Sequence, residues 1–319
     1  GYRKIKSLEG LQNAINLYSI QMDYNEITDI TPILKLEKLE YINFYSNFIS
    51  DITCLKNAKF LDNIEYDECL QFENNFIDFT LNNENYKILK ELLYKNIKDG
   101  KKSLIFEHTV NCQKNGRIEN INKVVNLDVN LKKKLIELGL DSNNDGNITR
   151  KELYTAYDIM DNEIDLSNSN ISNISGLEYL NPSSINLSNN NISDISGIEK
   201  WNQLTSVDLS YNKISNIAPI SNLFYMIEDG RNYAWDYWDI HTEIDLSHNK
   251  ISDITCVAKW KNIGNLNLSY NMISDIAVLN DYIYIEDTFE GQKNIDLSNN
   301  YINLENQNNL AAKEYFEKN

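Results

Sequence analysis

A unit of about 22 residues recurs along this sequence and restricts its fold more than any other feature. Each copy contains a short run of alternating apolar residues, then an Asn, then further apolar residues at fixed spacings. The Asn residues stand 22 positions apart in three pairs, Asn25 and Asn47, Asn190 and Asn212, and Asn249 and Asn271. A fixed period of this size indicates a solenoid, in which no single unit can bury its apolar face alone.

The copy at Leu204–Ile220 shows how one unit is expected to fold. Val207 and Leu209 are two positions apart, so they predict a short strand with both side chains on one face. Asn212 follows, where the chain leaves the strand and turns. Its amide can donate and accept, so we expect it to satisfy backbone groups of its own unit and of the next one.

Two polar columns alternate with the apolar strand positions. One column is acidic or amidic and consists of Asp165, Asn186, Asp208, Asp245, Asn267 and Asp296. The other consists of Ser167, Ser188, Ser210, Ser247, Ser269 and Ser298. Because the side-chain period of a strand is two, we expect both columns to face solvent on the concave side.

The best copies are LSNNNISDI (Leu187–Ile195), LSYNKISNI (Leu209–Ile217), LSHNKISDI (Leu246–Ile254) and LSYNMISDI (Leu268–Ile276). These segments resemble leucine-rich repeats, in the short bacterial subtype found in internalins. The resemblance covers about 20–60 and 163–304. It implies an α/β leucine-rich repeat solenoid with a parallel β-sheet on its concave side and irregular or 3₁₀ segments on its convex side. The subtype serves both host-cell adhesion and phosphatase regulation, so function stays open.

The pattern predicts five segments. Residues 1–67 form N-terminal repeats with a truncated or irregular start, and 68–123 form a helix plus a β-hairpin insertion. Residues 124–162 form a helix–loop–helix cap, 163–304 form the main repeats with two insertions, and 305–319 form a C-terminal capping helix. The chain begins in mid-repeat, which suggests either a cut from a longer protein or an irregular first cap.

The insertion block interrupts the repeats. A third repeat fades at Leu61, Ile64 and Tyr66, and apolar residues on one helical face predict a helix over Tyr86–Ile97. The dipeptide Asn115-Gly116 lies between two strand-like runs, which is typical of a β-hairpin.

The loop Asp141–Glu152 matches the calcium loop of an EF-hand position by position. Asp141, Asn143 and Asp145 fill positions 1, 3 and 5, Gly146 turns the chain at 6, Asn147 offers its carbonyl at 7, Ile148 packs inward at 8, Thr149 offers a hydroxyl or a water at 9, and Glu152 offers two oxygens at 12. Flanking helical patterns complete the motif. We predict one structural Ca²⁺ in this cap. The alternative is an Asx-rich turn that binds no metal.

Aromatic residues mark two candidate binding surfaces. The first insertion of the main array, between Asn212 and Asn249, contains Tyr233, Trp235, Tyr237 and Trp238. The position before the repeated Asn holds Tyr211, His248 and Tyr270 in consecutive units, which would make them adjacent. Insertions often mark the binding face of a repeat protein, and Trp and Tyr are frequent hot spots. We predict partner binding at these seven residues. The alternative is that the insertion rings only cover the core and that the column is a chance occurrence.

Charge narrows the class of partner. The chain has 319 residues, a net charge of −17 and a pI of about 4.6. This acidity argues against nucleic acid and anionic membranes, which are polyanions, and favours a basic partner surface or divalent cations. No apolar run approaches the roughly 20 residues of a membrane span. No signal peptide opens the sequence.

The reactive residue types show no catalytic pattern. The three histidines, His108, His241 and His248, lack metal-ligand spacing, and no nucleophile or phosphate-binding motif is found. We therefore expect no enzyme activity. Cys54 and Cys256 occupy equivalent slots of distant repeats and should be small buried side chains, whereas Cys69 and Cys112 lie in irregular sequence.

The sequence therefore predicts a non-catalytic module that binds a protein or a glycan, on a bacterial surface or secreted, with structural calcium. The partner would be a host or cell-surface molecule. The alternative is a cytoplasmic scaffold or a protein like the phosphatase regulators of the same subtype. Unpaired thiols favour this alternative because disulfides are rare in reducing compartments, whereas the resemblance to internalins favours the surface.

Overall fold

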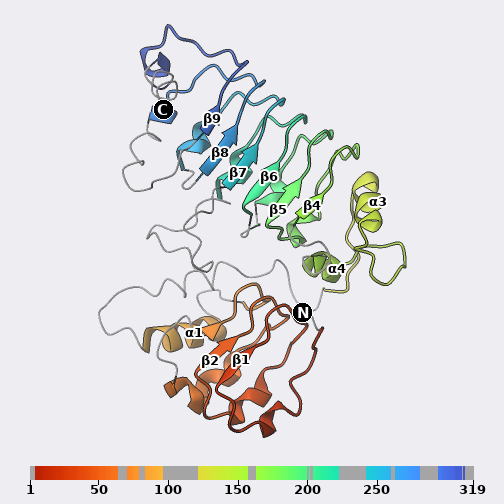
Figure 1. The fold of residues 1–319 in the computed structure, drawn as a ribbon, viewed down its shortest axis with the longest axis vertical. Helices are drawn as coiled ribbons and strands as arrows, with labels where there is room; N and C mark the ends of the chain where they lie inside the picture. Colours follow the sequence, from red (N-terminus) through yellow and green to blue (C-terminus); the bar gives the residue numbers. More distant parts are fainter. Residues whose placement is uncertain are drawn as a thin grey trace. The chain divides into compact units, whose positions relative to one another are not determined.

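The structure is a computed structural model that describes residues 4–63, 70–78, 83–95, 121–156, 163–199, 201, 204–222, 242–259, 263–280, 294–310 and 312. The chain divides into two compact units, Gly1–Ile121 and Asn122–Asn319. Figure 1 shows parallel strands stacked side by side within each unit. Among the described residues, no helix is long and apolar enough to cross a membrane.

The first unit is a short solenoid. Its parallel sheet has the order β1 (Ser19–Gln21), β2 (Tyr41–Asn43) and β3 (Leu70–Gln71). The 3₁₀ helix η1 (Leu11–Asn13) precedes β1, and η2 (Thr31–Lys35), η3 (Thr53–Asn57) and η4 (Lys59–Asn63) lie between the strands in sequence. Helix α1 (Glu84–Lys95) follows the last strand, close to the helix predicted over Tyr86–Ile97.

The third repeat of this unit lies later than predicted. Its strand is β3 rather than the segment around Leu61, Ile64 and Tyr66, so the repeats continue past the predicted boundary at residue 67. Helix η4 lengthens the convex side of the second repeat, which moves the next Asn to Asn75, 28 residues after Asn47. The predicted hairpin at Asn115-Gly116 lies outside the described residues.

The second unit begins with two helices and continues as a longer solenoid. The helices are α3 (Val129–Glu137) and α4 (Arg150–Tyr154). All six strands are parallel and follow chain order: β4 (Glu163–Asp165), β5 (Ser184–Asn186), β6 (Ser206–Asp208), β7 (Thr242–Asp245), β8 (Ile263–Asn267) and β9 (Asn294–Asp296). Turns and the short helices η8 (Leu177–Tyr179), η9 (Ser196–Ile198), η10 (Ala218–Asn222) and η11 (Thr255–Lys259) link them. The predicted solenoid of parallel strands and 3₁₀ segments is confirmed.

The apolar repeat positions stack into one continuous core. Ile185 pairs in register with Val207, and Val207 with Ile244, and all three are buried. Burying such side chains contributes roughly 1.5–3 kcal/mol each. A single unit would leave its apolar side chains exposed to water, so the core forms only when several units stack.

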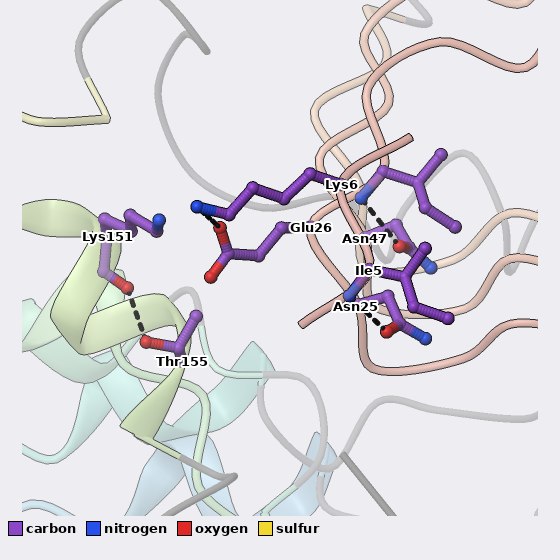
Figure 2. Close-up of polar contacts among 8 residues, drawn as sticks. Ile5, Lys6, Asn25, Glu26, Asn47, Lys151 and Thr155 are labelled. Carbon is purple, nitrogen blue, oxygen red and sulfur yellow. Dashed lines mark hydrogen bonds and ion pairs between the residues drawn. The ribbon is translucent and has the colours of Figure 1, made fainter. Parts of the chain in front are cut away.

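The repeated Asn residues join successive units through a ladder of hydrogen bonds, which we call the Asn ladder. Each Asn bonds to its own unit and to the preceding unit, whereas we predicted bonds to the next unit. Asn212 Nδ2 donates to the carbonyls of Leu209 (3.1 Å) in its own unit and Leu187 (3.0 Å) in the preceding unit. Its Oδ1 accepts from the backbone N–H of Ile192, also in the preceding unit, at 2.9 Å. Each Asn therefore ties its turn backward, not forward to the next unit. Figure 2 shows this backward bond in the first unit, where Asn25 accepts from Ile5.

Four members of the Ser column are not solvated as predicted, whereas Ser167 is half-buried and Ser298 is exposed. Ser188, Ser210, Ser247 and Ser269 are only 5–6% exposed. The chain turns sharply directly after each of these residues, so the Ser side chain is enclosed between neighbouring turns. The acidic or amidic residue two positions earlier accepts from the Ser backbone N–H, as Asp208 Oδ1 does from Ser210 at 2.9 Å. These are Asx turns.

Each array ends on an inserted Asn that the sequence pattern did not predict. In the first unit, buried Asn85 on α1 accepts from the N–H of Ile52 at 2.9 Å. In the second, buried Asn309 accepts from Ile276 N–H at 3.0 Å and donates to the Ser274 carbonyl. Ile52 and Ile276 hold the same repeat position. Both side chains follow the last strand of their array and satisfy a backbone N–H of the repeat before it.

Candidate functional site

The predicted aromatic column forms a face-to-face stack of three rings. The ring centroids of Tyr211 and His248 are 4.0 Å apart with an interplanar angle of 11°. Those of His248 and Tyr270 are 4.2 Å apart at 10°. Both Tyr side chains remain about half exposed, Tyr211 at 51% and Tyr270 at 50%. The structure therefore brings all three predicted residues together on the surface, and we call them the aromatic column.

The backbone beneath the aromatic column adopts an unfavourable conformation. Tyr211, His248 and Tyr270 have φ of 52°, 53° and 54°. This left-handed region costs a residue with a bulky side chain about 1 kcal/mol or more, whereas Asn tolerates it well. Asn168, Asn189 and Asn299 occupy the same position in the other repeats of the second unit, whereas the first unit has Tyr24, Ser46 and Asn74 there. The fold can thus use Asn here, and the three rings are not needed to make the turn.

Stacking also decides what the aromatic column can offer to a partner. Both faces of His248 and one face of each Tyr are covered by a neighbouring ring. The outer faces of Tyr211 and Tyr270 look toward Asn189 and Asn299, one repeat away. A sugar ring binds aromatic side chains through an open face, and only the outer faces of Tyr211 and Tyr270 are free of a neighbouring ring of the column. Its other free groups are ring edges, phenol hydroxyls and the imidazole, which can donate and accept hydrogen bonds.

The outward face of the second sheet lies beside the aromatic column and is acidic. Asp208, Glu243, Asp245 and Asp296 point away from the core on β6, β7 and β9, half-buried or exposed. Amides join some of them laterally, because Asn267 Nδ2 donates to Asp245 Oδ2 at 3.0 Å. No Lys or Arg occurs within strands β4 to β9.

The other predicted partner residues are not tested. Tyr233, Trp235, Tyr237 and Trp238 lie outside the described residues. They belong to the insertion between η10 and β7, and they stay predictions from the sequence.

The predicted calcium loop is held by hydrogen bonds from its side chains to its own backbone. Both Asp141 carboxylate oxygens accept backbone N–H groups, from Asp145 at 3.1 Å and Gly146 at 2.8 Å. Asn143 Oδ1 accepts from Asp145 N–H at 2.9 Å. Gly146 takes the sharp turn with φ of 76°, and Ile148 is fully buried. All side chains at candidate ligand positions carry oxygen donors, which suits Ca²⁺.

Glu152 is turned toward the ends of the loop. Its Oε2 accepts from the Thr149 N–H and hydroxyl, each at 2.8 Å, and its Oε1 accepts from Ser142 N–H at 3.0 Å. Thr149 and Glu152 thereby form the capping box of α4. Among the described residues, no three Asp, Glu, His or Cys side chains group closely enough to hold a metal ion. Ca²⁺ would need Glu152 to exchange these hydrogen bonds for metal ligation. The Asn147 side chain accepts a hydrogen bond from Lys132. This bond does not involve the Asn147 backbone carbonyl, which is the predicted calcium ligand.

A short antiparallel bridge supports the loop from outside. Val125 N–H donates to the Ile148 carbonyl at 2.8 Å, and Arg150 N–H donates to the Lys123 carbonyl at 3.1 Å. The segment that contains Val125 also packs on the first repeat, where a Cβ at Gly176 would lie 2.7 Å from Val125 Cγ1. The loop, the helices and the first repeat are therefore one packed assembly. The sequence pattern did not predict this bridge.

The predicted cysteine environments are tested only in part. Cys54 and Cys256 are half-buried against the cores of their units, less buried than predicted. Burial, with Asp51 and Asp29 nearby, raises the pKa of the Cys54 thiol to about 11. This thiol stays protonated at neutral pH and is a weak nucleophile. Cys69 and Cys112 lie outside the described residues.

Comparisons with known proteins agree with the repeat geometry. Residues 183–222 match the family model described as Leucine Rich repeats (2 copies). Two similar solved structures are internalins of Listeria monocytogenes: inlF (22% identity, 98% of this chain, 76% of that chain, TM-score 0.38) and internalin C2 (16%, 94%, 76%, 0.29). A leucine-rich repeat protein of Leptospira interrogans is also similar (16%, 92%, 57%, 0.33). A search of curated proteins gave no match.

The fold is that of a leucine-rich repeat solenoid. This assignment follows from the stacked parallel strands, the Asn ladder and the family match at 183–222. These similarities to solved structures are too distant to indicate a partner.

Proposed function

We propose that this chain is a non-catalytic protein-binding module and that the aromatic column, Tyr211, His248 and Tyr270, contacts the partner. The observation that supports this most is the strained backbone under three stacked rings, of which the two Tyr rings are exposed and His248 is half-buried. A residue type that costs stability where Asn would serve suggests selection for something other than folding. Tyr is also a frequent hot-spot residue at interfaces.

A protein partner fits the aromatic column better than a glycan. Four of the six ring faces are covered, both faces of His248 and one of each Tyr, and the edges carry hydroxyl and imidazole groups that pair with peptide groups and polar side chains. We place the module on a bacterial surface or in a secreted protein, on the strength of the repeat subtype. The cytoplasmic scaffold is the alternative, and the protonated thiol of Cys54 is compatible with either compartment.

The test is to select peptides from a phage-displayed random library on the immobilised full chain. Their affinity is then measured for the chain and for a variant in which Tyr211, His248 and Tyr270 are all changed to Asn. We expect the variant to bind at least tenfold more weakly, because hot-spot truncations cost about 2 kcal/mol or more. Equal affinity for both proteins would place the binding site elsewhere.

We also propose that Asp141–Glu152 binds one Ca²⁺ that stabilises the cap of the second array. The oxygen donors of Asp141, Asn143, Asp145 and Glu152, with the Asn147 carbonyl, support this proposal. Ca²⁺ supplies a divalent charge that relieves the repulsion between the carboxylates. Saturation at a hundred times the Kd would add about 2.7 kcal/mol to the free energy of unfolding.

Calorimetric titration with Ca²⁺ and thermal unfolding in Ca²⁺ and in chelator test this site. We expect 1:1 binding heat and a higher Tm in Ca²⁺, both lost in Glu152→Gln. Gln removes the ligand charge and can keep the capping box with Thr149 through its one carbonyl oxygen, but the Ser142 N–H then loses its acceptor, so the variant is compared with the unchanged chain in chelator as well as in Ca²⁺. If the unchanged chain gives neither heat nor a Tm shift, the loop is a polar turn held by its own hydrogen bonds, among them those of Asp141 and Glu152.

A further inference from the structure

The outward face of the second sheet is uncovered within the described part of the chain and carries charge of one sign. We call Asp208, Glu243, Asp245 and Asp296 the acidic sheet face. None of the four forms an ion pair with a described residue, and no strand of the sheet contributes a cation. Asp165, at the start of the sheet, differs from these four because a cation lies near it. The hydrogen bond from Ser167, and to a smaller extent the charge of Lys134, lower the pKa of its carboxyl. The uncompensated charge therefore lies over β6 to β9.

We infer that the partner lays a basic segment, rich in Lys or Arg, on the acidic sheet face beside the aromatic column. This inference rests on the proposed binding function and names the chemistry of its partner. Like charges at close range destabilise a complex, so a second copy of this acidic face is a poor occupant. A net charge of −17 would also steer a basic partner toward the chain.

The carboxylates keep binding capacity after their internal hydrogen bonds are counted. Asp208 Oδ1 accepts from Ser210 N–H, and Asp296 Oδ1 from Ser298 N–H at 2.8 Å. Each ionised carboxylate has about four acceptor positions, so several stay available to ammonium or guanidinium groups. The strands β6 to β9 span three steps of about 4.8 Å, a length that about four or five extended residues cover.

Lysines limit where the basic segment can lie. Lys213 and Lys250 are exposed two residues after Tyr211 and His248, on the other side of the inward-pointing Asn residues. A basic segment is attracted to the sheet and repelled from this lysine row. The aromatic column lies between the two in sequence, so its polar edges can contact a segment that runs across the sheet.

The chain offers a closely matched pair of variants. The face variant is Asp208→Asn with Asp245→Asn and Asp296→Asn. Asn186 and Asn267 already occupy this column and make the same bond to the Ser two positions later, so the turns are retained. The control variant is Asp194→Asn with Asp253→Asn and Asp275→Asn, on the convex turns. Each of these Asp side chains accepts a hydrogen bond from the backbone N–H two residues later in the chain. Asn216 occupies the same repeat position and accepts the equivalent bond, so Asn is tolerated there.

Both variants change the net charge equally, so only the position of the charge differs. The probes are the peptides selected from the random library on the full chain. We expect them to be enriched in Lys and Arg and to bind the face variant about tenfold more weakly, with a smaller dependence on NaCl. The control variant should bind within about twofold of the unchanged chain.

Three outcomes overturn the inference: a selection without binders, binders without basic residues, or equal affinity for the face and control variants. Binders that are lost with the aromatic column but not with the face variant contradict the inference and leave the proposed function intact. Binders that tolerate all variants contradict both. Sedimentation of the unliganded chain checks self-association, and a dimer lost in the face variant would also overturn the inference.

Discussion

Asn212→Ala is expected to lower the free energy of unfolding of the second unit by about 3–5 kcal/mol. The Asn212 side chain is 8% exposed and bonds to four backbone groups, three carbonyls and the Ile192 N–H. Alanine leaves these groups in a site too enclosed for ready hydration. Each buried unsatisfied group costs about 1–3 kcal/mol, and partial relaxation keeps the total below the sum.

Asn216→Ala is the matched control for this change. Asn216 lies in the same repeat, but its side chain makes one exposed hydrogen bond, to the Ala218 N–H at 3.0 Å. Loss of such a capping bond costs about 0.5–1 kcal/mol. Urea unfolding followed by circular dichroism measures both variants. Similar costs for the two substitutions would show that the Asn ladder does not stabilise the solenoid.

Gly176→Ala should lower the free energy of unfolding by about 2–4 kcal/mol through two effects. Gly176 has φ of 101°, which an L side chain rarely adopts. An added Cβ would also lie 2.5 Å from Leu127 Cδ2 and 2.7 Å from Val125 Cγ1, atoms of the segment that joins the helical cap to the first repeat. Relief of the contact would require that segment to move.

Gly139→Ala separates these two effects. Gly139 also has positive φ, 87°, but a Cβ there meets nothing within 4 Å. It should cost only the backbone strain, about 1 kcal/mol. Urea unfolding gives the difference between the variants, and limited proteolysis near α3 reports whether the cap has loosened. If the two alanines cost the same, Val125 and Leu127 do not lock the cap onto the repeat.

Much of the fold could be predicted because the repeat is periodic. The spacing of residues such as Val207 and Asn212 predicts a strand, a turn and their stacking, since each repeat places the same groups at the same height. The aromatic column followed from the same register. Its stacking was predicted only as adjacency, because sequence spacing does not give ring orientation.

The structure differs from the predictions at features that the repeat spacing alone does not determine. The third strand was missed because η4 lengthens the repeat before it. The direction of the Asn ladder depends on which neighbouring carbonyl the Nδ2 group reaches. Asn85 and Asn309 act from outside the repeat pattern, and each lies among other Asn residues in a segment after the last repeat, so the sequence gives no sign of which Asn is buried. Burial of Ser210 depends on the sharp turn at Tyr211.

The central claim is that Tyr211, His248 and Tyr270 serve binding and not folding. The most direct measurement is the free energy of unfolding of the triple Asn variant, by urea titration, on the same sample used for peptide affinity. Asn relieves strain of about 1 kcal/mol per position, while the lost stacking costs about 0.5–1.5 kcal/mol per pair. We expect stability within about 1 kcal/mol of the unchanged chain, with binding at least tenfold weaker. Stability several kcal/mol lower with binding intact would contradict the claim.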